Sequence, residues 1–368
     1  MSASSSPSFA NAAWSRLKKN KGAIFGLVII AIAVLVAVFA YLIAPDPSPH
    51  ANRIILEIGG EKPGYTKTFV RLPKAIQTPA PGFFNRLING KPDNYDYIPV
   101  NRYRFVGKDS VQLIRFIDES VEDSIVVATN TSIANFEKNN IRKQSFLLGT
   151  DKYGRDICSR IILGTRVSLG VGFITVFISL TIGLMLGSLA GYYRGRTDNI
   201  IMWFINVVWS IPTLLLVFAI TLALGKGFWQ VFVAVGLTMW VNVARTVRGQ
   251  ILVEREKEYV EATRALGYSG YRTIVKHIWP NIMGPVLVIA AANFASAIVI
   301  EAGLSFIGIG VQPPQPSWGL MIRDNYNFII TNNPMLALAP GFAIMLLVLA
   351  FNLLGNGLRD ALHVRGKI

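Results

Sequence analysis

The chain of 368 residues is 52% hydrophobic and only 15% charged, with a mean hydropathy of +0.44. Soluble domains carry about 25% charged residues. The apolar residues gather in runs of about 20, the length of a helix that crosses a bilayer. These features exclude a soluble enzyme, a secreted disulfide scaffold and a disordered chain. They predict a polytopic membrane protein.

The net charge of +15 is concentrated in a few segments of the chain. Lys and Arg outnumber Asp and Glu in residues 1–22, 194–198 and 245–277 and from Arg359 onward. All four segments fall on one side of a topology with six spans, and basic residues concentrate on the cytoplasmic side of membrane proteins. We therefore expect both termini in the cytoplasm and no binding to nucleic acid. The single Cys158 cannot form an internal disulfide.

The N-terminal half begins with a cytoplasmic segment, 1–22, and a first span, 23–44. That apolar run is too long for a signal peptide, whose hydrophobic region has about 7–15 residues. Residues 45–147 contain no apolar run of spanning length and are rich in Pro, Asn, Lys and Asp. Short β-type runs at 103–106, 111–117 and 124–127 predict a β-rich extracytoplasmic insert.

The remaining chain, 148–365, is predicted to hold five more spans and a cytoplasmic loop at 245–281. The spans are expected at about 167–192, 200–224, 228–244, 282–300 and 335–354. The predicted fold class is an all-α polytopic membrane protein with six transmembrane helices and a β-rich insert between the first two.

Two spans carry residues that affect helix packing. Gly183, Gly187 and Gly191 form overlapping GxxxG units, which let another backbone approach closely. Such a stripe serves either plain packing or a moving interface near a translocation path. Pro212 removes a backbone hydrogen bond from the third span and favours a kink.

The loop 245–281 contains the most informative pattern. Residues 254–266 are good helix formers, and Gly267 can adopt the left-handed conformation that ends a helix. We expect a second short helix that Pro280 stops before the membrane, and small residues Ala262, Thr263 and Ala265 exposed for close docking. An ordinary amphipathic helix beside the membrane is the alternative.

This loop resembles the coupling motif of ABC importer permeases, Glu-Ala-Ala-x3-Gly-x9-Ile-x-Leu-Pro, which docks on the ATPase. Glu261, Ala262, Gly267 and Pro280 match it at the right spacing. Thr263, His277 and Trp279 replace the motif's second Ala, its Ile and its Leu, and His-Ile-x-Pro-Asn is common in the peptide-transporting branch.

Further stretches resemble the C-type permease subunit of dipeptide, oligopeptide and nickel importers. They are 148–160 with 164–169, 243–252, 301–319 and 352–360. The resemblance is loose over 1–44 and close over 146–365. The insert at 45–147 is longer than the usual first outer loop of this family.

The resemblance implies a type I ABC importer permease in a bacterial inner membrane. Its expected partners are a related second permease, two cytoplasmic ATPases and an extracytoplasmic substrate-binding protein. ATP and Mg²⁺ are expected on the ATPases, and no cofactor on this chain. The expected substrate is a di- or oligopeptide, with nickel or another small solute as the alternative. A channel or a membrane enzyme is less in keeping with the pattern.

Two sets of candidate residues follow. The ATPase-coupling set is Glu261, Ala262, Thr263, Gly267 and Pro280. The pore or gating set is Arg245, Arg248, Pro212 and Glu301.

Glu301 is acidic in an apolar context, which marks a functional candidate. It either attracts a peptide amino terminus, or pairs with an Arg or caps the following helix.

The sequence gives little indication of a nucleotide-binding site or a metal-binding site. Gly149-x4-Gly154-Arg155 is nearly a P-loop but lacks the Lys and the Ser/Thr. His50, His277 and His363 are scattered, with no other ligand at metal-binding spacing.

Overall fold

The computed structural model describes residues 9–107, 109–118, 121–129, 132–225, 227–330 and 333–362. Two compact units make up the chain. The transmembrane unit comprises Met1–Val34, Ser168–Gln312 and Ile344–Ile368, and the insert unit comprises Leu35–Val167 and Pro313–Ala343. Three long helices, α2, α6 and α14, contribute residues to both.

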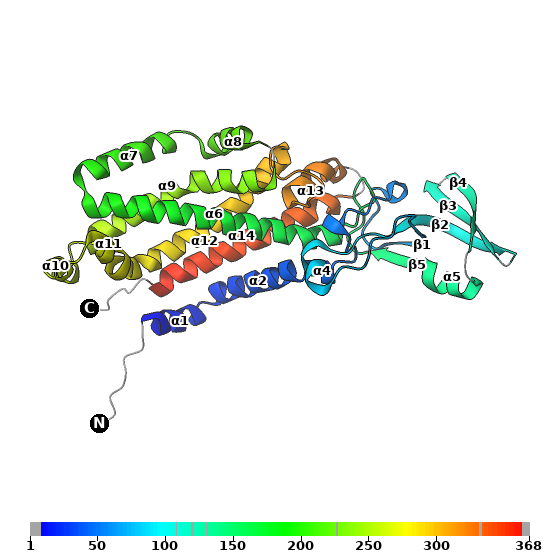
Figure 1. The fold of residues 1–368 in the computed structure, drawn as a ribbon, viewed down its shortest axis with the longest axis horizontal. Helices are drawn as coiled ribbons and strands as arrows, with labels where there is room; N and C mark the ends of the chain where they lie inside the picture. Colours follow the sequence, from blue (N-terminus) through cyan, green and yellow to red (C-terminus); the bar gives the residue numbers. More distant parts are fainter. Residues whose placement is uncertain are drawn as a thin grey trace, which may run out of the picture. The chain divides into compact units, whose positions relative to one another are not determined.

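Helices dominate the transmembrane unit, and Figure 1 shows α6, α9 and α12 running alongside one another. Its helices are α1 (Phe9–Lys19), α2 (Lys21–Val38), α6 (Ile157–Tyr193), α7 (Gly195–Trp209), α8 (Thr213–Leu224), α9 (Phe228–Glu254), α10 (Glu258–Ala265), α11 (Gly270–Thr273), α12 (Trp279–Ile307) and α14 (Met335–Leu362). A π-helical turn, Ile274–Ile278, joins α11 to α12.

Five helical stretches in the described residues are long and apolar enough to cross a membrane: 21–38, 157–193, 228–254, 270–307 and 335–362. The pair α7 and α8, bent by 91° at its break, gives a sixth span if the two helices form one crossing. The chain is thus a polytopic helical membrane protein, as predicted.

The third predicted span, 200–224, is not one straight helix. The break lies at Ser210–Pro212, where Pro212 in extended conformation precedes α8. Proline cannot donate to the preceding turn, so the helix ends and restarts. The kink expected at Pro212 is therefore a complete break.

Pro280 does not stop a helix, contrary to expectation. It lies in the first turn of α12, where the missing N–H is tolerated. In the π turn before it, Trp279 N donates to Ile274 O, five residues earlier in the chain. The helical path therefore continues from this turn into α12 without a break at the proline. The segment 270–307 is continuous as a result.

The insert unit contains a five-stranded antiparallel sheet in the order β4-β3-β2-β1-β5. Its strands are β1 (Tyr65–Pro73), β2 (Tyr95–Val106), β3 (Ser110–Asp118), β4 (Val121–Ala128) and β5 (Ile141–Phe146). The three predicted β-type runs lie in β2, β3 and β4, so the prediction of a β-rich insert is confirmed. The unit's helices are α3 (Ala40–Ile43), α4 (Phe83–Asn89), α5 (Ile133–Asn140) and α13 (Trp318–Asn325).

Both faces of the sheet are covered at β1. Successive residues of a strand point to opposite faces, and Phe69 and Val70 of β1 are both fully buried. Phe69 packs with Phe116 and Phe146, and Val70 packs in a second cluster.

Candidate functional site

The candidate site is α10 with the turn that follows it. Glu258 and Glu261 lie in the first turn of α10, where a negative charge interacts favourably with the helix dipole. Gly267 has a φ of +73°. Its N–H donates to Arg264 O at 2.9 Å, and Tyr268 N donates to Thr263 O at 3.0 Å. These two bonds form a Schellman cap, the helix end predicted for this glycine.

The helix starts later than expected. Glu254 is the last residue of α9, and residues 255–257 form a turn before α10. The predicted helix 254–266 therefore divides into the end of one long helix and a separate short one.

One face of α10 is buried in the helix bundle. Val260 joins a buried cluster with Ile251 of α9 and Ile282 of α12. Thr263 is only 5% exposed, and its hydroxyl donates to Val260 O at 2.7 Å. The Thr263 hydroxyl also lies 3.3 Å from the Thr273 hydroxyl. The prediction that Thr263 is exposed for docking is wrong, because it lies on the same side of the helix as Val260.

Polar contacts fix the start of α10. The buried Glu254 accepts hydrogen bonds from Lys257 Nζ and from the Tyr259 hydroxyl, both at 2.7 Å. Asn281 Nδ2 donates to the same hydroxyl at 3.3 Å. Burial, together with the Glu254 carboxylate, raises the pKa of Tyr259. Tyr259 therefore stays a neutral hydrogen-bond donor at physiological pH.

The opposite face of α10 is open. Glu261, Ala262 and Ala265 are exposed, and the Glu261 carboxylate makes no ion pair with any residue that the structure describes. Leu266 is 70% exposed and Tyr271 is 75% exposed. Sequence reasoning missed these two, since a leucine or tyrosine in a helical pattern usually indicates a core position.

Two of the predicted gating residues connect α9 to α7. Arg248 donates from Nε and Nη2 to the two carboxylate oxygens of Asp198, each at 2.6 Å. The Arg245 guanidinium lies 3.7 Å from the centre of the Trp209 ring and donates to Asn206 Oδ1 at 3.4 Å. A bidentate Arg–carboxylate pair fixes geometry as well as charge. Asp198 was not singled out from the sequence, where it reads as one charge of a short loop.

Glu301 lies in α12, and Pro212 lies at the start of α8. Glu301 is fully buried in α12. It accepts a hydrogen bond from Ser305 Oγ at 2.7 Å, and Ser305 Oγ accepts one from Val311 N at 3.0 Å. This chain of bonds holds the turn after α12 and does not reach the following helix, α13, so both alternatives for Glu301 stay predictions.

The glycine stripe of α6 lies against α9. A Cβ added to Gly183, Gly187 or Gly191 would come within 3.0 Å of α9 atoms. In each case these atoms include a main-chain oxygen, namely that of Trp240, Ala244 or Arg248, respectively. Close packing between two helices of this chain therefore requires the stripe. Movement at this interface stays a prediction.

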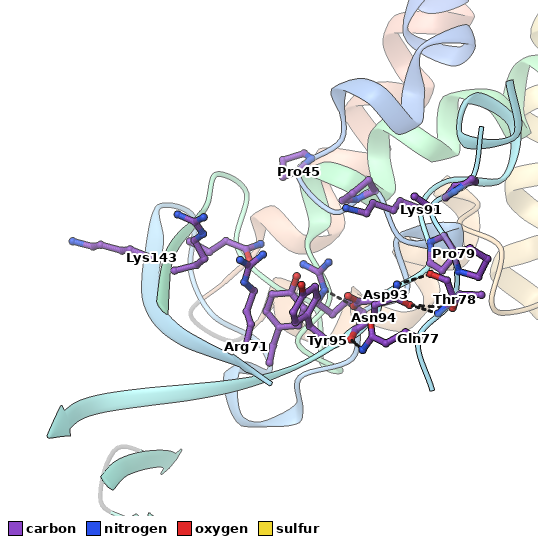
Figure 2. Close-up of a pocket in the computed structure, with 18 residues that line it drawn as sticks. Pro45, Arg71, Gln77, Thr78, Pro79, Lys91, Asp93, Asn94, Tyr95 and Lys143 are labelled. Carbon is purple, nitrogen blue, oxygen red and sulfur yellow. Dashed lines mark hydrogen bonds and ion pairs between the residues drawn. The ribbon is translucent and has the colours of Figure 1, made fainter. Parts of the chain in front are cut away.

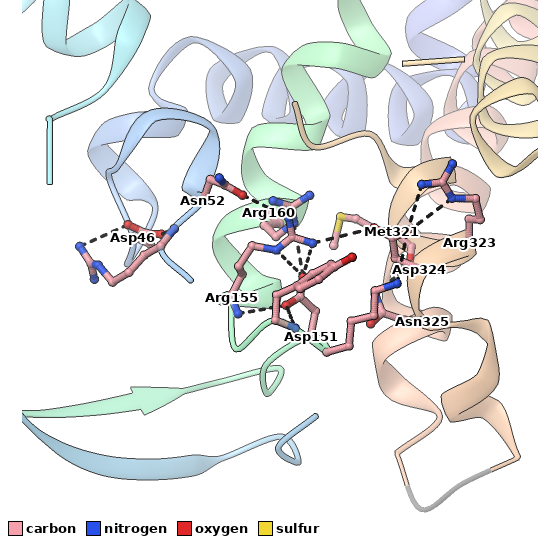
Figure 3. A network of polar contacts seen from close by, with 12 residues as sticks. Asp46, Asn52, Asp151, Arg155, Arg160, Met321, Arg323, Asp324 and Asn325 are labelled. Atoms are coloured by element: carbon pink, nitrogen blue, oxygen red, sulfur yellow. Dashed lines mark hydrogen bonds and ion pairs between the residues drawn. The ribbon is translucent and has the colours of Figure 1, made fainter. Parts of the chain in front are cut away.

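The segment that resembles the family before its second span forms a charged network in the insert unit (Figure 3). Asp151 accepts from Arg155 Nε at 2.7 Å and from the main-chain N–H groups of Tyr153 and Arg155. Arg160 is almost fully buried, with Nε 3.9 Å from Asp151. Asp324 of α13 lies 3.9 Å from Arg155. In the turn that resembles a P-loop, the buried Asp151 carboxylate therefore accepts the main-chain hydrogen bonds that a P-loop would give to a phosphate.

A cavity of about 480 Å³ also lies in the insert unit (Figure 2). Five cationic side chains and one carboxylate, Asp93, line it. Arg53 is already paired with Asp93 at 2.7 Å, and the Lys143 side chain extends away from Asp93. The described ranges hold no group of three His, Cys, Asp or Glu suited to a metal. His363 and the rest of 363–368 lie outside the described residues.

Comparison with known proteins defines the class of this chain. The family model for the binding-protein-dependent transport system inner membrane component matches residues 183–366. The model for the N-terminal TM domain of oligopeptide transport permease C matches residues 8–55. The chain belongs to the binding-protein-dependent transport system inner membrane component family, and is thus a multi-pass inner-membrane permease.

Three curated relatives show the branch to which the chain is similar. The glutathione transport system permease protein GsiD of Pectobacterium atrosepticum is 42% identical over 220 residues, 60% of this chain and 73% of the relative. The dipeptide permease DppC of Alkalihalophilus pseudofirmus is 41% identical over 219 residues, 60% of this chain and 72% of the relative. The oligopeptide permease OppC of Bacillus subtilis is 39% identical over 234 residues, 64% of this chain and 76% of the relative.

Proposed function

We propose that this chain is one of two related permease subunits of an ATP-driven importer for di- or oligopeptides. Its relatives at about 40% identity carry the names of dipeptide, oligopeptide and glutathione permeases. In this proposal a binding protein delivers the peptide from outside, and two cytoplasmic ATPases bind ATP and Mg²⁺. The permease itself binds no cofactor and hydrolyses nothing.

The observation that carries the proposal is the two-sided character of α10. Val260 and Thr263 are buried in the bundle, while Glu261, Ala262, Ala265 and Leu266 face outward. A short helix that packs on the bundle with one face can bind a partner protein with its other, exposed face. Movement of the bound partner would then be passed to the bundle. The outward face combines one carboxylate, two small residues and one leucine, which suits close docking in a groove of the ATPase.

Force applied to α10 has a rigid route into the bundle. Val260 packs on residues of α9 and α12, and the Tyr259–Glu254 hydrogen bond links α10 to the end of α9. Arg248 then joins α9 to α7 through Asp198. Close-packed interiors transmit displacement because they are little compressible. In this proposal Arg245 and Arg248 take part in gating by coupling α9 to α7, and Pro212 does so through the break between α7 and α8.

The proposed topology places α10 and both termini in the cytoplasm, since the basic segments 1–22, 194–198 and 245–277 then share one side. The insert at 45–147 lies outside in this arrangement. There it serves as a cap over the pore mouth or as a platform for the binding protein.

The substrate is tested by uptake into proteoliposomes that contain the complete transporter. Labelled di- and oligopeptides are expected to accumulate when ATP is enclosed with the ATPases, and radioactive nickel is not. Nickel uptake without peptide uptake would overturn the peptide assignment and favour the alternative substrate.

A further inference from the structure

The short helix α4 in the insert unit is amphipathic. With 3.6 residues per turn, Phe83, Phe84, Leu87 and Ile88 share one side, and Asn85, Arg86 and Asn89 share the other. Gly90, with a φ of +81°, ends the helix, and its N–H donates to Arg86 O at 3.0 Å. The helix is thus short, well defined and two-faced.

Its apolar side is largely exposed, as is its polar side. Phe83, Phe84 and Ile88 are 61%, 77% and 61% exposed, and only Leu87 is half-buried. Two phenylalanines and an isoleucine on one surface in water are unfavourable, because apolar area gains free energy on leaving water. The described residues of the insert unit leave this side open, so something else covers it.

The position of α4 indicates what covers it. Gly90 lies against Tyr41 of α3, where a Cβ would come within 2.8 Å of the ring, and Lys91 N donates to Pro47 O at 2.8 Å. Helix α3 directly follows the first span, α2, near the end of the apolar run 23–44. Helix α4 therefore lies at the depth where the first span leaves the hydrocarbon.

A second contact gives the same depth independently. Arg166 Nη1 donates to Ile88 O at 3.1 Å, and its guanidinium lies 5.2 Å from the centre of the Tyr41 ring. Arg166 is the last charged residue of α6 before a stretch that carries no charge up to Arg194. Since α6 has 37 residues and a span needs about 20, the uncharged stretch after Arg166 is long enough to cross the hydrocarbon, and Arg166 lies on its headgroup side.

Val38, Phe39 and Ile43 at the end of the first span are exposed apolar residues. Arg86 and Lys91, on and just after α4, are exposed cations that suit lipid phosphates.

We propose that α4 lies in the membrane–water interface, with Phe83, Phe84 and Ile88 among the acyl chains and Arg86 at the headgroups. Amphipathic helices with this arrangement bind in the interfacial plane. The assignment to the outer leaflet rests on the proposed topology, whereas insertion of the helix does not. The insert is then attached to the bilayer at α4 as well as through its two flanking spans.

Spin labelling of the full chain in vesicles of phosphatidylethanolamine and phosphatidylglycerol tests the proposal. Cys158 is first replaced by serine, and a label is placed at Phe84→Cys or Ile88→Cys. Asn85→Cys and Asn89→Cys, on the other side of α4, are the matched controls. Labels at 84 and 88 should be several-fold more accessible to oxygen, and less accessible to a water-soluble nickel chelate, than labels at 85 and 89.

Two results would overturn the proposal. Equal access of the nickel chelate to all four positions would place α4 in water. Low access of both reagents to 84 and 88 would mean that protein, and not lipid, covers the helix. As a second measurement, with Cys158 replaced by serine, a thiol-linked fluorophore at Phe84→Cys should be quenched by brominated lipid acyl chains several-fold more than the same fluorophore at Asn85→Cys, and equal quenching would contradict insertion.

Discussion

At the scale of single residues, Gly267 is the position where backbone conformation matters most for the candidate site. Its φ of +73° lies in the left-handed region, and a Cβ there would meet no atom within 4 Å. Any cost of a side chain at this position is therefore conformational and not steric crowding. The sequence predicted this helix end because a run of helix formers stops at a glycine.

We predict that Gly267→Val destabilises the end of α10 by about 1 kcal/mol or more, since β-branched residues resist positive φ. Amide hydrogen exchange across 258–268 should become faster in the variant. Gly267→Asn is the control, because asparagine tolerates this conformation. Equal protection in Gly267→Val and the wild-type chain would show that the Schellman cap contributes nothing to the helix.

Residue type alone does not say which side of a helix is covered. Thr263 matched the small-residue pattern of the coupling motif, yet it is buried beside Val260. Leu266 had the character of a core residue, yet it is largely exposed. The distinction depends on how α10 packs against α9 and α12, which are contacts with residues outside the motif.

At the scale of helices and strands, the α6–α9 contact shows what the sequence could indicate and what it could not. The spacing of Gly183, Gly187 and Gly191 predicted a close helix contact, but the partner helix could only come from the structure. The same holds for the α7–α8 break, where Pro212 predicted a kink and its extent depends on surrounding packing. The π turn before Pro280 has no sequence signal that we recognise.

We predict that Gly187→Ala lowers the stability of the permease by about 1–3 kcal/mol, the usual cost of overpacking. Its Cβ would come within 2.5 Å of Ala244 O and 2.9 Å of Val247 Cβ. Thermal unfolding in detergent measures the effect. Gly170→Ala in the same helix is the control, since a Cβ there meets nothing within 4 Å. A melting temperature for Gly187→Ala equal to that of the control would contradict the packing seen between α6 and α9.

At the scale of the whole molecule, hydropathy and charge predicted the polytopic class, and β-type runs predicted a sheet in the insert. Strands β1 and β5 were missed, as were α4 and α5. A sheet of this order depends on contacts between distant segments: β1 pairs with β5, about 70 residues later in the chain. Local patterns carry no information about such pairings.

The topology is predicted to place the insert outside and α10 inside. With Cys158 replaced by serine, Ala75→Cys in intact cells should react with a thiol reagent that cannot cross the membrane. Lys257→Cys should react only after the membrane is opened, because it precedes α10 in the proposed cytoplasmic loop. The reverse pattern would invalidate the assignment of the six spans.

The measurement that tests the central claim most directly compares ATPase association and peptide uptake in the double variant Glu261→Lys/Gly267→Val. The first change reverses a charge on the open face of α10, and the second strains the helix end. Arg196→Glu, an exposed charge reversal in the other proposed cytoplasmic loop, is the control. The double variant should insert normally, yet lose co-purification of the ATPases and ATP-dependent uptake, while the control keeps both. Wild-type association and uptake in the double variant would show that α10 is only a helix beside the membrane, and that coupling to ATP occurs elsewhere.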